Sequence, residues 1–383
     1  MLAVVVNAGY LLLSRSYNES ARPVVAAKKI EWIAASLQQI SPPGTNAFYP
    51  RMIQLSDGGL LLAYASQGNI IVQKSFDRGQ HWQPSIIAAE KEDGVNMDTP
   101  ELLQLFNGEV LLSYNGRPQG ALKNTPETGK RFDIRIKKTS DKGLSWNNTK
   151  TLYAAGESFK DGCWEPAAIQ LPNGVIQLFF SDEGIYTNSN EQNISMLSSA
   201  DNGANWSAQP KIISFRNNSR DGMPVPVWLP AQKEIAIAIE DPGIKNFKPV
   251  IIRSSANGTW DRVINGSDAQ RSFALEDKIA DTVYAGAPYL RRLSNAVTIL
   301  SYQSTEDRIG KNTDANAVMI VATGDEDATG FTNKTIPFAI PQGYHALWNS
   351  LCIIKNDTII ALTSTNGFSK SASEVWMIKG VLK

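Results

Sequence analysis

One short motif recurs three times in this chain, as SFDRGQHW (Ser75–Trp82), TSDKGLSW (Thr139–Trp146) and SADNGANW (Ser199–Trp206). The shared pattern is Ser/Thr-x-Asp-x-Gly-x-x-Trp, and a shortened copy, SSANGTW, follows at Ser254–Trp260. Each copy predicts a tight hairpin turn. The Asp side chain accepts hydrogen bonds from backbone N–H groups in the turn, the Gly adopts the positive φ that the turn needs, and the Trp packs between sheets. Three copies with similar strands before them indicate one structural unit used repeatedly.

A second repeat lies upstream of each motif. It reads Pro, an alternating apolar strand, a turn that ends in Gly and a second apolar strand, and its copies begin 50 to 66 residues apart. The three clear copies and the three weaker ones are Tyr49–Ser66, Thr99–Gly116, Glu165–Asp182, Met223–Asp241, Ala287–Ser304 and Leu347–Ser364. Six such units predict an all-β fold, a six-bladed β-propeller of four-stranded antiparallel blades. We expect residues 26–383 to form this single domain, with the N-terminal residues completing the ring.

The amino-acid composition excludes several classes of function. The 383 residues carry 37 Lys plus Arg against 37 Asp plus Glu, so no basic surface predicts binding to nucleic acid or to an anionic membrane. Two Cys and two His exclude a disulfide-rich scaffold and argue against a zinc site, so we expect no metal and no cofactor. Cys163 and Cys352 are expected to be free thiols, and His345 a hydrogen-bonded loop residue. Any chemistry must therefore rest on carboxylates, aromatic side chains and arginines.

Two features predict a secreted or extracytoplasmic glycoprotein. Residues 1–25 form a targeting-like segment whose apolar stretch, between Leu2 and Leu13, is too short to span a bilayer; the alternative is an incomplete first segment. Glycosylation sequons of the form Asn-x-Ser/Thr begin at nine positions: Asn18, Asn147, Asn193, Asn205, Asn217, Asn257, Asn265, Asn333 and Asn356. We expect a monomer with no stable membrane span.

Propeller topology predicts where a site lies. The innermost strand of a blade starts on the face at which the next strand ends, so residues far apart in sequence meet on one rim around the axis. Glu165 opens the third unit and Glu240 closes the second strand of the fourth, which places two carboxyl groups on neighbouring blades. Glycoside hydrolysis needs two such groups, one to deliver a proton and one to act as nucleophile or base. The alternative is that either glutamate is a solvated rim residue or pairs with an arginine.

Eight further rim residues are candidates for substrate binding: Arg51, Asp98, Trp164, Asp182, Glu183, Tyr284, Gln303 and Trp348. Arg51 is expected to orient Glu165 or Asp98, and Asp98 to bind sugar or cap a turn. Asp182 and Glu183 are expected to tune a neighbouring pKa or bind hydroxyls, or else to begin a solvated loop. The three aromatic side chains either stack on sugar rings or pack between blades.

These elements resemble the sialidase superfamily of Asp-box (BNR) propellers and, more narrowly, the exo-α-1,5-arabinanases of glycoside hydrolase family 93. The resemblance covers roughly residues 45–380. Its segments are YPR (Tyr49–Arg51), WEP to SDE (Trp164–Glu183), GMPV (Gly222–Val225), IAIED (Ile237–Asp241), GAPY to LSYQS (Gly286–Ser304) and LWNSL (Leu347–Leu351). The resemblance implies that Glu165 and Glu240 are the catalytic pair, and we take Glu165 as the nucleophile and Glu240 as the acid/base. It also implies a retaining, exo-acting hydrolase that cleaves arabinan-type chains from the non-reducing end.

Two other functions remain open at this point. A sialidase of this fold holds the sialate carboxylate with three arginines, since Arg pairs with carboxylates in a bidentate manner. Here Arg51 is well placed and Arg220 lies near the rim, but Arg291 and Arg292 lie too deep in their strand, and YPRM replaces a FRIP-like opening. A non-catalytic glycan-binding propeller would need no paired glutamates. We therefore predict a hydrolase that acts on a neutral oligo- or polysaccharide.

Overall fold

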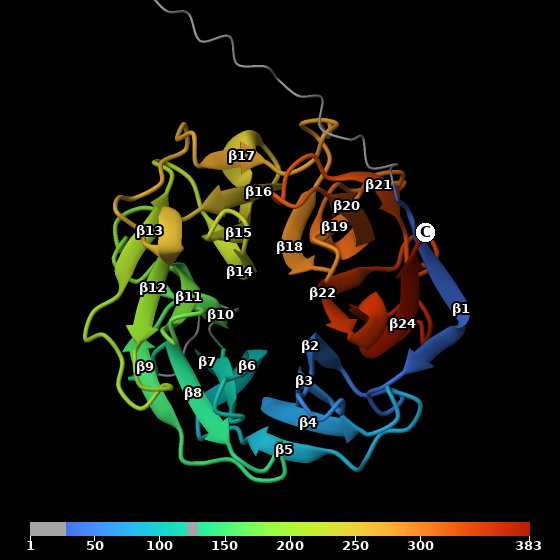
Figure 1. Ribbon diagram of the computed structural model, residues 1–383, viewed down its shortest axis with the longest axis horizontal. Coiled ribbons are helices and arrows are strands. Elements are labelled where there is room, and N and C mark those ends of the chain that lie inside the picture. Colours follow the sequence, from blue (N-terminus) through green and yellow to red (C-terminus); the bar gives the residue numbers. More distant parts are fainter. Residues whose placement is uncertain (1–27, 121–128) are drawn as a thin grey trace, which may run out of the picture.

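The computed structural model describes residues 28–120 and 129–383 as six four-stranded antiparallel sheets, arranged as blades around a central axis (Figure 1). The prediction of an all-β, six-bladed propeller is confirmed. The expected targeting-like segment, residues 1–25, lies outside the described residues. In the part of the chain that is described, no helix is long and apolar enough to cross a membrane.

Each blade runs from an innermost strand beside the axis to an outermost strand. Blades one and two comprise β2 (Ala47–Gln54), β3 (Leu60–Ser66), β4 (Asn69–Ser75), β5 (Ile86–Ala89), and β6 (Val95–Gln104), β7 (Val110–Pro118), β8 (Asp133–Thr139), β9 (Lys150–Ala154). Blades three and four comprise β10 (Cys163–Gln170), β11 (Ile176–Asp182), β12 (Asn193–Ser199), β13 (Lys211–Phe215), and β14 (Gly222–Leu229), β15 (Glu234–Asp241), β16 (Lys248–Arg253), β17 (Arg271–Phe273). Blade five comprises β18 (Ala285–Arg292), β19 (Thr298–Ser304), β20 (Val318–Gly324) and β21 (Thr332–Thr335). Short 3₁₀ turns interrupt the loops at η2 (Phe159–Asp161), η3 (Pro242–Ile244), η4 (Ala256–Gly258), η5 (Asp314–Asn316) and η6 (Lys355–Asp357).

Blade six closes the ring with strands from both ends of the described chain. Its inner strands are β22 (Ala346–Ile354), β23 (Thr358–Thr365) and β24 (Glu374–Leu382), and its outermost strand is β1 (Ile30–Gln39). β1 pairs antiparallel with β24 from Ile30–Leu382 to Gln39–Trp376. The first and last strands therefore lie side by side (Figure 1), as the sequence predicts, and the backbone hydrogen bonds between them hold the ring shut.

The repeated Asp motif forms the expected turn between the third and fourth strands of its blade. In the first copy, Asp77 Oδ1 accepts the N–H groups of Gln80 and His81 at 3.0 and 2.9 Å, and Ser75 Oγ accepts that of Gly79 at 2.8 Å. Gly79 has a φ of +79°, which explains the glycine. Each third strand runs parallel to its innermost strand and ends where that strand ends. The Asp turns therefore lie at the face opposite the starts of the innermost strands.

A backbone kink near the start of every innermost strand shapes the axis. The register shifts there, and the kink residues Tyr49, Thr99, Glu165, Met223, Ala287 and Trp348 have φ values between 45° and 54°. Five of the six precede a proline, a context that favours extended backbone. A non-glycine residue held at a positive φ typically costs about 1–3 kcal/mol. Packing around the axis offsets this cost, and Tyr49, Met223 and Ala287 from three blades form one buried cluster there.

Candidate active site

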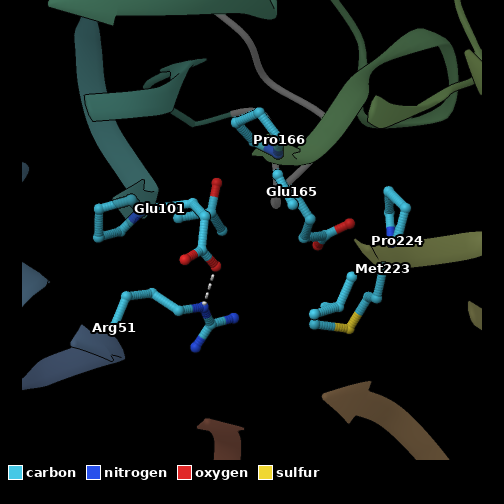
Figure 2. A pocket seen from close by; sticks show the side chains of 10 residues that line it. Arg51, Glu101, Glu165, Pro166, Met223 and Pro224 are labelled. Atoms are coloured by element: carbon cyan, nitrogen blue, oxygen red, sulfur yellow. Dashed lines mark ion pairs between the residues drawn. The ribbon is translucent and has the colours of Figure 1, made fainter. Parts of the chain in front are cut away.

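Glu165 is the kink residue of β10, and the neighbouring blade holds it in place. Its backbone N–H donates to Asn115 Oδ1 on β7 at 2.9 Å, while Asn115 Nδ2 donates to the Cys163 carbonyl at 2.8 Å. Its side chain is 18% exposed. Figure 2 shows it reaching from β10 towards Met223, on the axis side of Pro166. The kink and the amide of Asn115 together fix where this carboxyl group lies.

The contact made by Asn115 recurs around the ring and explains the position of Glu240. A side chain near the end of the second strand accepts the N–H of the kink residue in the next blade. The four bonds are Asn115 with Glu165 at 2.9 Å, Ser181 with Met223 at 3.0 Å, Glu240 with Ala287 at 2.8 Å and Gln303 with Trp348 at 2.9 Å. The matching positions in blades one and six hold Ala65, which has no acceptor, and Ser364, whose Oγ has no partner among the described residues. We call the four side chains that make this bond the inter-blade acceptors: Asn115, Ser181, Glu240 and Gln303. Among them, Glu240 carries a carboxylate.

Two glycines make room for the Glu240 carboxyl group. A Cβ atom at Gly222 would lie 3.0 Å from Glu240 Oε1, and one at Gly286 would lie 2.7 Å from both Glu240 Oε2 and the Tyr284 hydroxyl. The equivalent positions in the other blades carry side chains, namely Phe48, Asp98, Trp164 and Leu347. The absence of a side chain at both positions leaves space beside this one carboxylate.

Burial raises the pKa of both glutamates. The pKa of Glu165 rises from 4.5 to about 8, because burial and the nearby charges of Glu240 and Glu183 outweigh the opposing effect of the Arg117 guanidinium. Burial also raises the pKa of Glu240, against the hydrogen bond from Ala287 and the charge of Arg220. The charge of Glu240 thus adds to the effect of burial on Glu165, and the raised pKa favours a protonated Glu165 at neutral pH.

This raised pKa predicts a pH-dependent effect of Glu165→Gln on stability. The folded protein binds the Glu165 proton more tightly than the unfolded chain does. Its contribution to stability is therefore complete below pH 4.5 and is lost as the pH rises towards 8. The neutral Gln cannot ionise, so the melting temperature of the variant should gain on the wild type between pH 5 and 8.5. Parallel melting curves across that range would contradict the raised pKa.

Arg117 is the residue of this site that the sequence prediction missed. It lies near the end of β7, with Nη1 3.0 Å from Asp98 Oδ2 and Nη2 4.0 Å from Glu165 Oε1. Its guanidinium carbon lies 5.6 Å from the ring centre of Tyr49 and 5.1 Å from that of Trp164. Asp98 is thus a partner of Arg117, and its other oxygen accepts the Thr99 N–H at 2.7 Å. The repeat unit predicted from the sequence ends at Gly116, but β7 continues to Pro118, which carries Arg117 to the rim.

Arg51 does not have the role expected from the sequence. Its Nε lies 3.2 Å from Glu101 Oε2, and its Nη1 donates to the Trp348 carbonyl at 3.0 Å. Figure 2 shows this ion pair to the lower left of Glu165, on the side of blades one and two. Among the described contacts, Arg51 has none with Glu165 or Asp98, because it follows the kink by two residues and lies deeper along the axis. The hollow that Arg51 and Glu101 line together with Glu165 measures about 10 Å³, which is room for about one water molecule.

Asp182 and Glu183 are adjacent in sequence but have different partners. The carboxylate of Glu183 accepts the Trp164 indole N–H at 3.2 Å and pairs with Arg220, and burial raises its pKa to about 7. Its charge acts on Glu165, so it belongs to the site. Asp182 instead accepts the Tyr153 hydroxyl from β9 at 3.0 Å and the Gly184 N–H at 2.9 Å. Its oxygens are thus bonded within the protein, between blades two and three.

Aromatic side chains and an amide complete the rim. Tyr49 and Trp348 stack with ring centres 4.9 Å apart, and Trp348 is held by Gln303, whose Nε2 donates to the Tyr284 hydroxyl at 2.7 Å. The charge of Glu240 raises the already high pKa of buried Tyr284, which places that ring beside the carboxylate. Trp164 is largely buried and packs on Phe132 and Phe159, so its packing role dominates. The candidate site thus combines two glutamates of raised pKa with the stacked rings of Tyr49 and Trp348.

The remaining expectations from the sequence concern residues outside the site. Cys163 and Cys352 are free and buried, as predicted. His345 Nε2 lies 3.0 Å from Ser373 Oγ, which confirms a hydrogen-bonded loop residue. The sequon at Asn193 lies on a fully buried side chain, whereas those at Asn147 and Asn205 are exposed.

Comparisons with known proteins identify the fold. No family model and no curated protein matches the chain. A GH93 α-L-arabinofuranosidase of Fusarium graminearum, solved with arabinobiose, is 18% identical over 90% of this chain and 97% of its own, with a TM-score of 0.66. An α-L-arabinanase of Penicillium chrysogenum, also complexed with arabinobiose, is 18% identical over 92% of this chain and 97% of its own, with a TM-score of 0.60. The NanB sialidase of Streptococcus pneumoniae is 12% identical over 91% of this chain and 70% of its own, with a TM-score of 0.61.

The resemblance to sialidase-superfamily propellers of the GH93 type is therefore confirmed at the level of architecture. The matches extend along almost the whole described ring, while the identities of 12% to 18% are too low to transfer an activity. The chain has the six-bladed β-propeller fold that these arabinofuranosidase, arabinanase and sialidase structures share.

Proposed function

We propose that this protein is a glycoside hydrolase in which Glu165 and Glu240 are the catalytic pair. One observation carries the proposal: two largely buried carboxyl groups from adjacent blades sit at the same end of the axis, both with a raised pKa, and the charge of Glu240 acts on Glu165. Two such carboxyl groups, one protonated and one ionised, would supply an acid and a base or nucleophile. The neighbouring aromatic rings of Tyr49 and Trp348 would offer a surface for a sugar.

We take Glu165 as the nucleophile and Glu240 as the acid/base, following the resemblance of the blade openings to GH93. Burial is the largest cause of the raised pKa of Glu165, so this group must lose a proton before it can attack, and the guanidinium of Arg117 favours its ionised form. In a retaining reaction, protonated Glu240 would give its proton to the leaving oxygen while Glu165 attacks the anomeric carbon. Glu240 would then deprotonate the water that releases the sugar from Glu165.

The pairing of the arginines supports a neutral substrate. Arg117 lies against Asp98, Arg51 against Glu101 and Arg220 against Glu183. A sialate carboxylate would have to displace one of these carboxylates to reach a guanidinium, at the cost of a buried ion pair. We therefore propose exo-acting cleavage of α-1,5-arabinan-type chains from the non-reducing end, with the sialidase as the alternative.

A product assay tests the substrate. The protein is incubated separately with linear α-1,5-arabinan and with a sialyl oligosaccharide, and the released sugars are separated and identified. We expect short arabinose-containing products from the first incubation and no free sialic acid from the second. Release of sialic acid alone would replace this proposal with the alternative, and no release from either chain would favour a glycan-binding propeller.

Azide rescue tests the assignment of roles, by comparing Glu165→Ala and Glu240→Ala with an activated aryl arabinofuranoside. Azide can enter the space left by either side chain. We expect the acid/base variant Glu240→Ala to regain turnover and give a glycosyl azide of retained configuration. The nucleophile variant Glu165→Ala should give the inverted azide. The opposite pair of products would exchange the two roles.

The raised pKa of Glu165 also predicts the acid limit of activity. The nucleophile must be ionised, so kcat/KM should rise with pH until about 8, the pKa of Glu165, and then level off. It should fall again at higher pH, where Glu240 loses the proton that it delivers. The pH dependence of kcat/KM on the active substrate checks this, and constant activity between pH 5 and 8 would show that Glu165 need not lose a proton in this range.

We also propose that the protein acts outside the cytoplasm, and the glycosylation sequons support this. Asn147 directly follows the second Asp motif and Asn205 lies in the third; both are exposed, so a glycan there would not disturb the core. Peptide mapping of the protein from its native source, before and after enzymatic deglycosylation, would test whether glycan is attached there.

A further inference from the structure

A cavity lies at the opposite end of the axis from the candidate active site. It measures about 480 Å³ and is lined by residues near the ends of the innermost strands, including Gln54, Leu103, Ile169, Trp228, Arg291 and Arg292. Innermost strands start at the rim that holds Glu165 and end here, so this cavity opens on the face of the Asp turns. We call it the far cavity.

A cluster of charged and aromatic side chains separates the far cavity from Glu165. Both oxygens of Glu101 lie 3.1 Å from the Tyr289 hydroxyl, with Arg51 Nε at 3.2 Å and Arg291 Nη2 at 3.7 Å. The guanidinium carbons of Arg51 and Arg291 lie 4.9 and 4.3 Å from the centre of the Tyr289 ring. These contacts fill the middle of the channel, so a ligand in the far cavity would be separate from the catalytic pair.

The positive charges along this part of the axis are not balanced. Arg51, Arg291 and Arg292 contribute three guanidinium groups, and Glu101 is the one carboxylate among the described residues that line the far cavity. Arg292 has no ion pair or hydrogen bond among the described contacts, and its buried Nε has no partner. A partly buried guanidinium without an ion pair attracts a counter-ion, and the attraction is stronger where apolar walls lower the dielectric.

We propose that the far cavity binds a small oxyanion, held by Arg292 with Arg291 beside it. A guanidinium offers parallel N–H groups that match the oxygens of a phosphate, a sulfate or a carboxylate. The apolar side chains of Leu103, Ile169 and Trp228 line the walls and strengthen the charge interaction by excluding water. Binding would neutralise the excess charge at the base of the channel and stabilise the closed ring. This site does not depend on the proposed hydrolase activity.

Thermal denaturation with different anions tests the proposal. The melting temperature of the full chain is followed against increasing sodium phosphate, sodium sulfate and sodium acetate, with sodium chloride at matched ionic strength as the reference. A ligand that binds only the folded state raises the melting temperature progressively above its Kd. We expect a rise of several degrees over the chloride reference with at least one oxyanion, and the comparison of phosphate and sulfate with acetate tells inorganic anions from carboxylates.

Variants show where the anion binds. Arg292→Gln should abolish the oxyanion-specific rise, and Arg292→Lys, which keeps the charge without the planar fork, should weaken it. Arg78→Gln, at an exposed arginine of the first Asp motif, should keep the full effect. If Arg292→Gln does not fold, the test rests on Arg292→Lys. This variant should need at least tenfold more oxyanion than the wild type for the same rise in melting temperature. Equal responses in wild type and Arg292 variants, or no rise beyond chloride, would overturn the proposal.

Discussion

Glu240→Gln should lower kcat/KM by about 10²- to 10⁴-fold while the melting temperature stays close to that of the wild type. The amide oxygen of Gln can still accept the Ala287 N–H that the carboxylate accepts at 2.8 Å, so the contact between blades four and five survives. What the variant loses is the ability to give and take a proton. Glu165→Gln should lose at least as much activity, because its amide cannot form a covalent intermediate.

Two further variants separate the chemical and structural roles of Glu240. Glu240→Ala removes the acceptor as well as the acid, and a buried N–H left without a partner costs about 1–3 kcal/mol. This variant should therefore lose both activity and stability. Glu157→Gln, at an exposed carboxylate in the loop after β9, should retain both. Near wild-type activity of Glu240→Gln on the substrate identified by the product assay would remove Glu240 from the mechanism.

Arg271→Met should give the largest loss of stability, because it strips two fully buried carboxylates of their shared partner. Arg271 Nη1 lies 2.8 Å from Asp221 Oδ2, and its Nη2 contacts Asp241 Oδ2 at 2.5 Å; both aspartates are 0% exposed. Arg216 holds Asp241 from a second side at 2.8 Å. Removing one member of such a buried network typically costs about 3–5 kcal/mol.

Urea denaturation of this variant, with Arg262→Met as the control, measures the difference. Arg262, whose side chain is more than half exposed, pairs with Asp268, and an ion pair made by such an exposed arginine is typically worth about 0–1 kcal/mol. Asp221 and Asp241 directly flank Gly222 and Glu240, so any folded Arg271→Met protein should also lose activity. Similar unfolding midpoints for the two variants would show that the network contributes little.

The blade architecture could be predicted from the sequence because each blade repeats its own local signals. The Asp turns depend on contacts within about four residues, as between Asp77 and His81, and such contacts are visible in a short motif. The pairing of strands within a blade follows from the alternation of apolar residues. The sequence could place Glu165 and Glu240 on one rim because both lie at fixed positions of that repeat, and their catalytic role stays a prediction.

The rest of the site depends on geometry that no local motif records. The kink before each proline moves Arg51 two residues deeper along the axis, so that it meets Glu101 and not Glu165. Asp182 and Glu183 sit where β11 ends, and a shift of one residue there reverses which side chain faces the axis. Arg117 was missed because the length of β7 beyond its apolar residues is set by pairing with its neighbours.

The inter-blade acceptors have a consequence for redesign. Asn115 and Gln303 make the same backbone contact as Glu240 through an amide oxygen, and Ser181 makes it through a hydroxyl, so this structural task does not specify the residue type. A protein engineer could therefore move the acid around the ring: Gln303→Glu combined with Glu240→Gln would transfer the carboxyl group one blade onward, beside Tyr284 and Trp348, and leave every inter-blade bond in place. Such a relocated acid would meet a bound glycan from a new direction, which opens a route to other linkages on an unchanged scaffold.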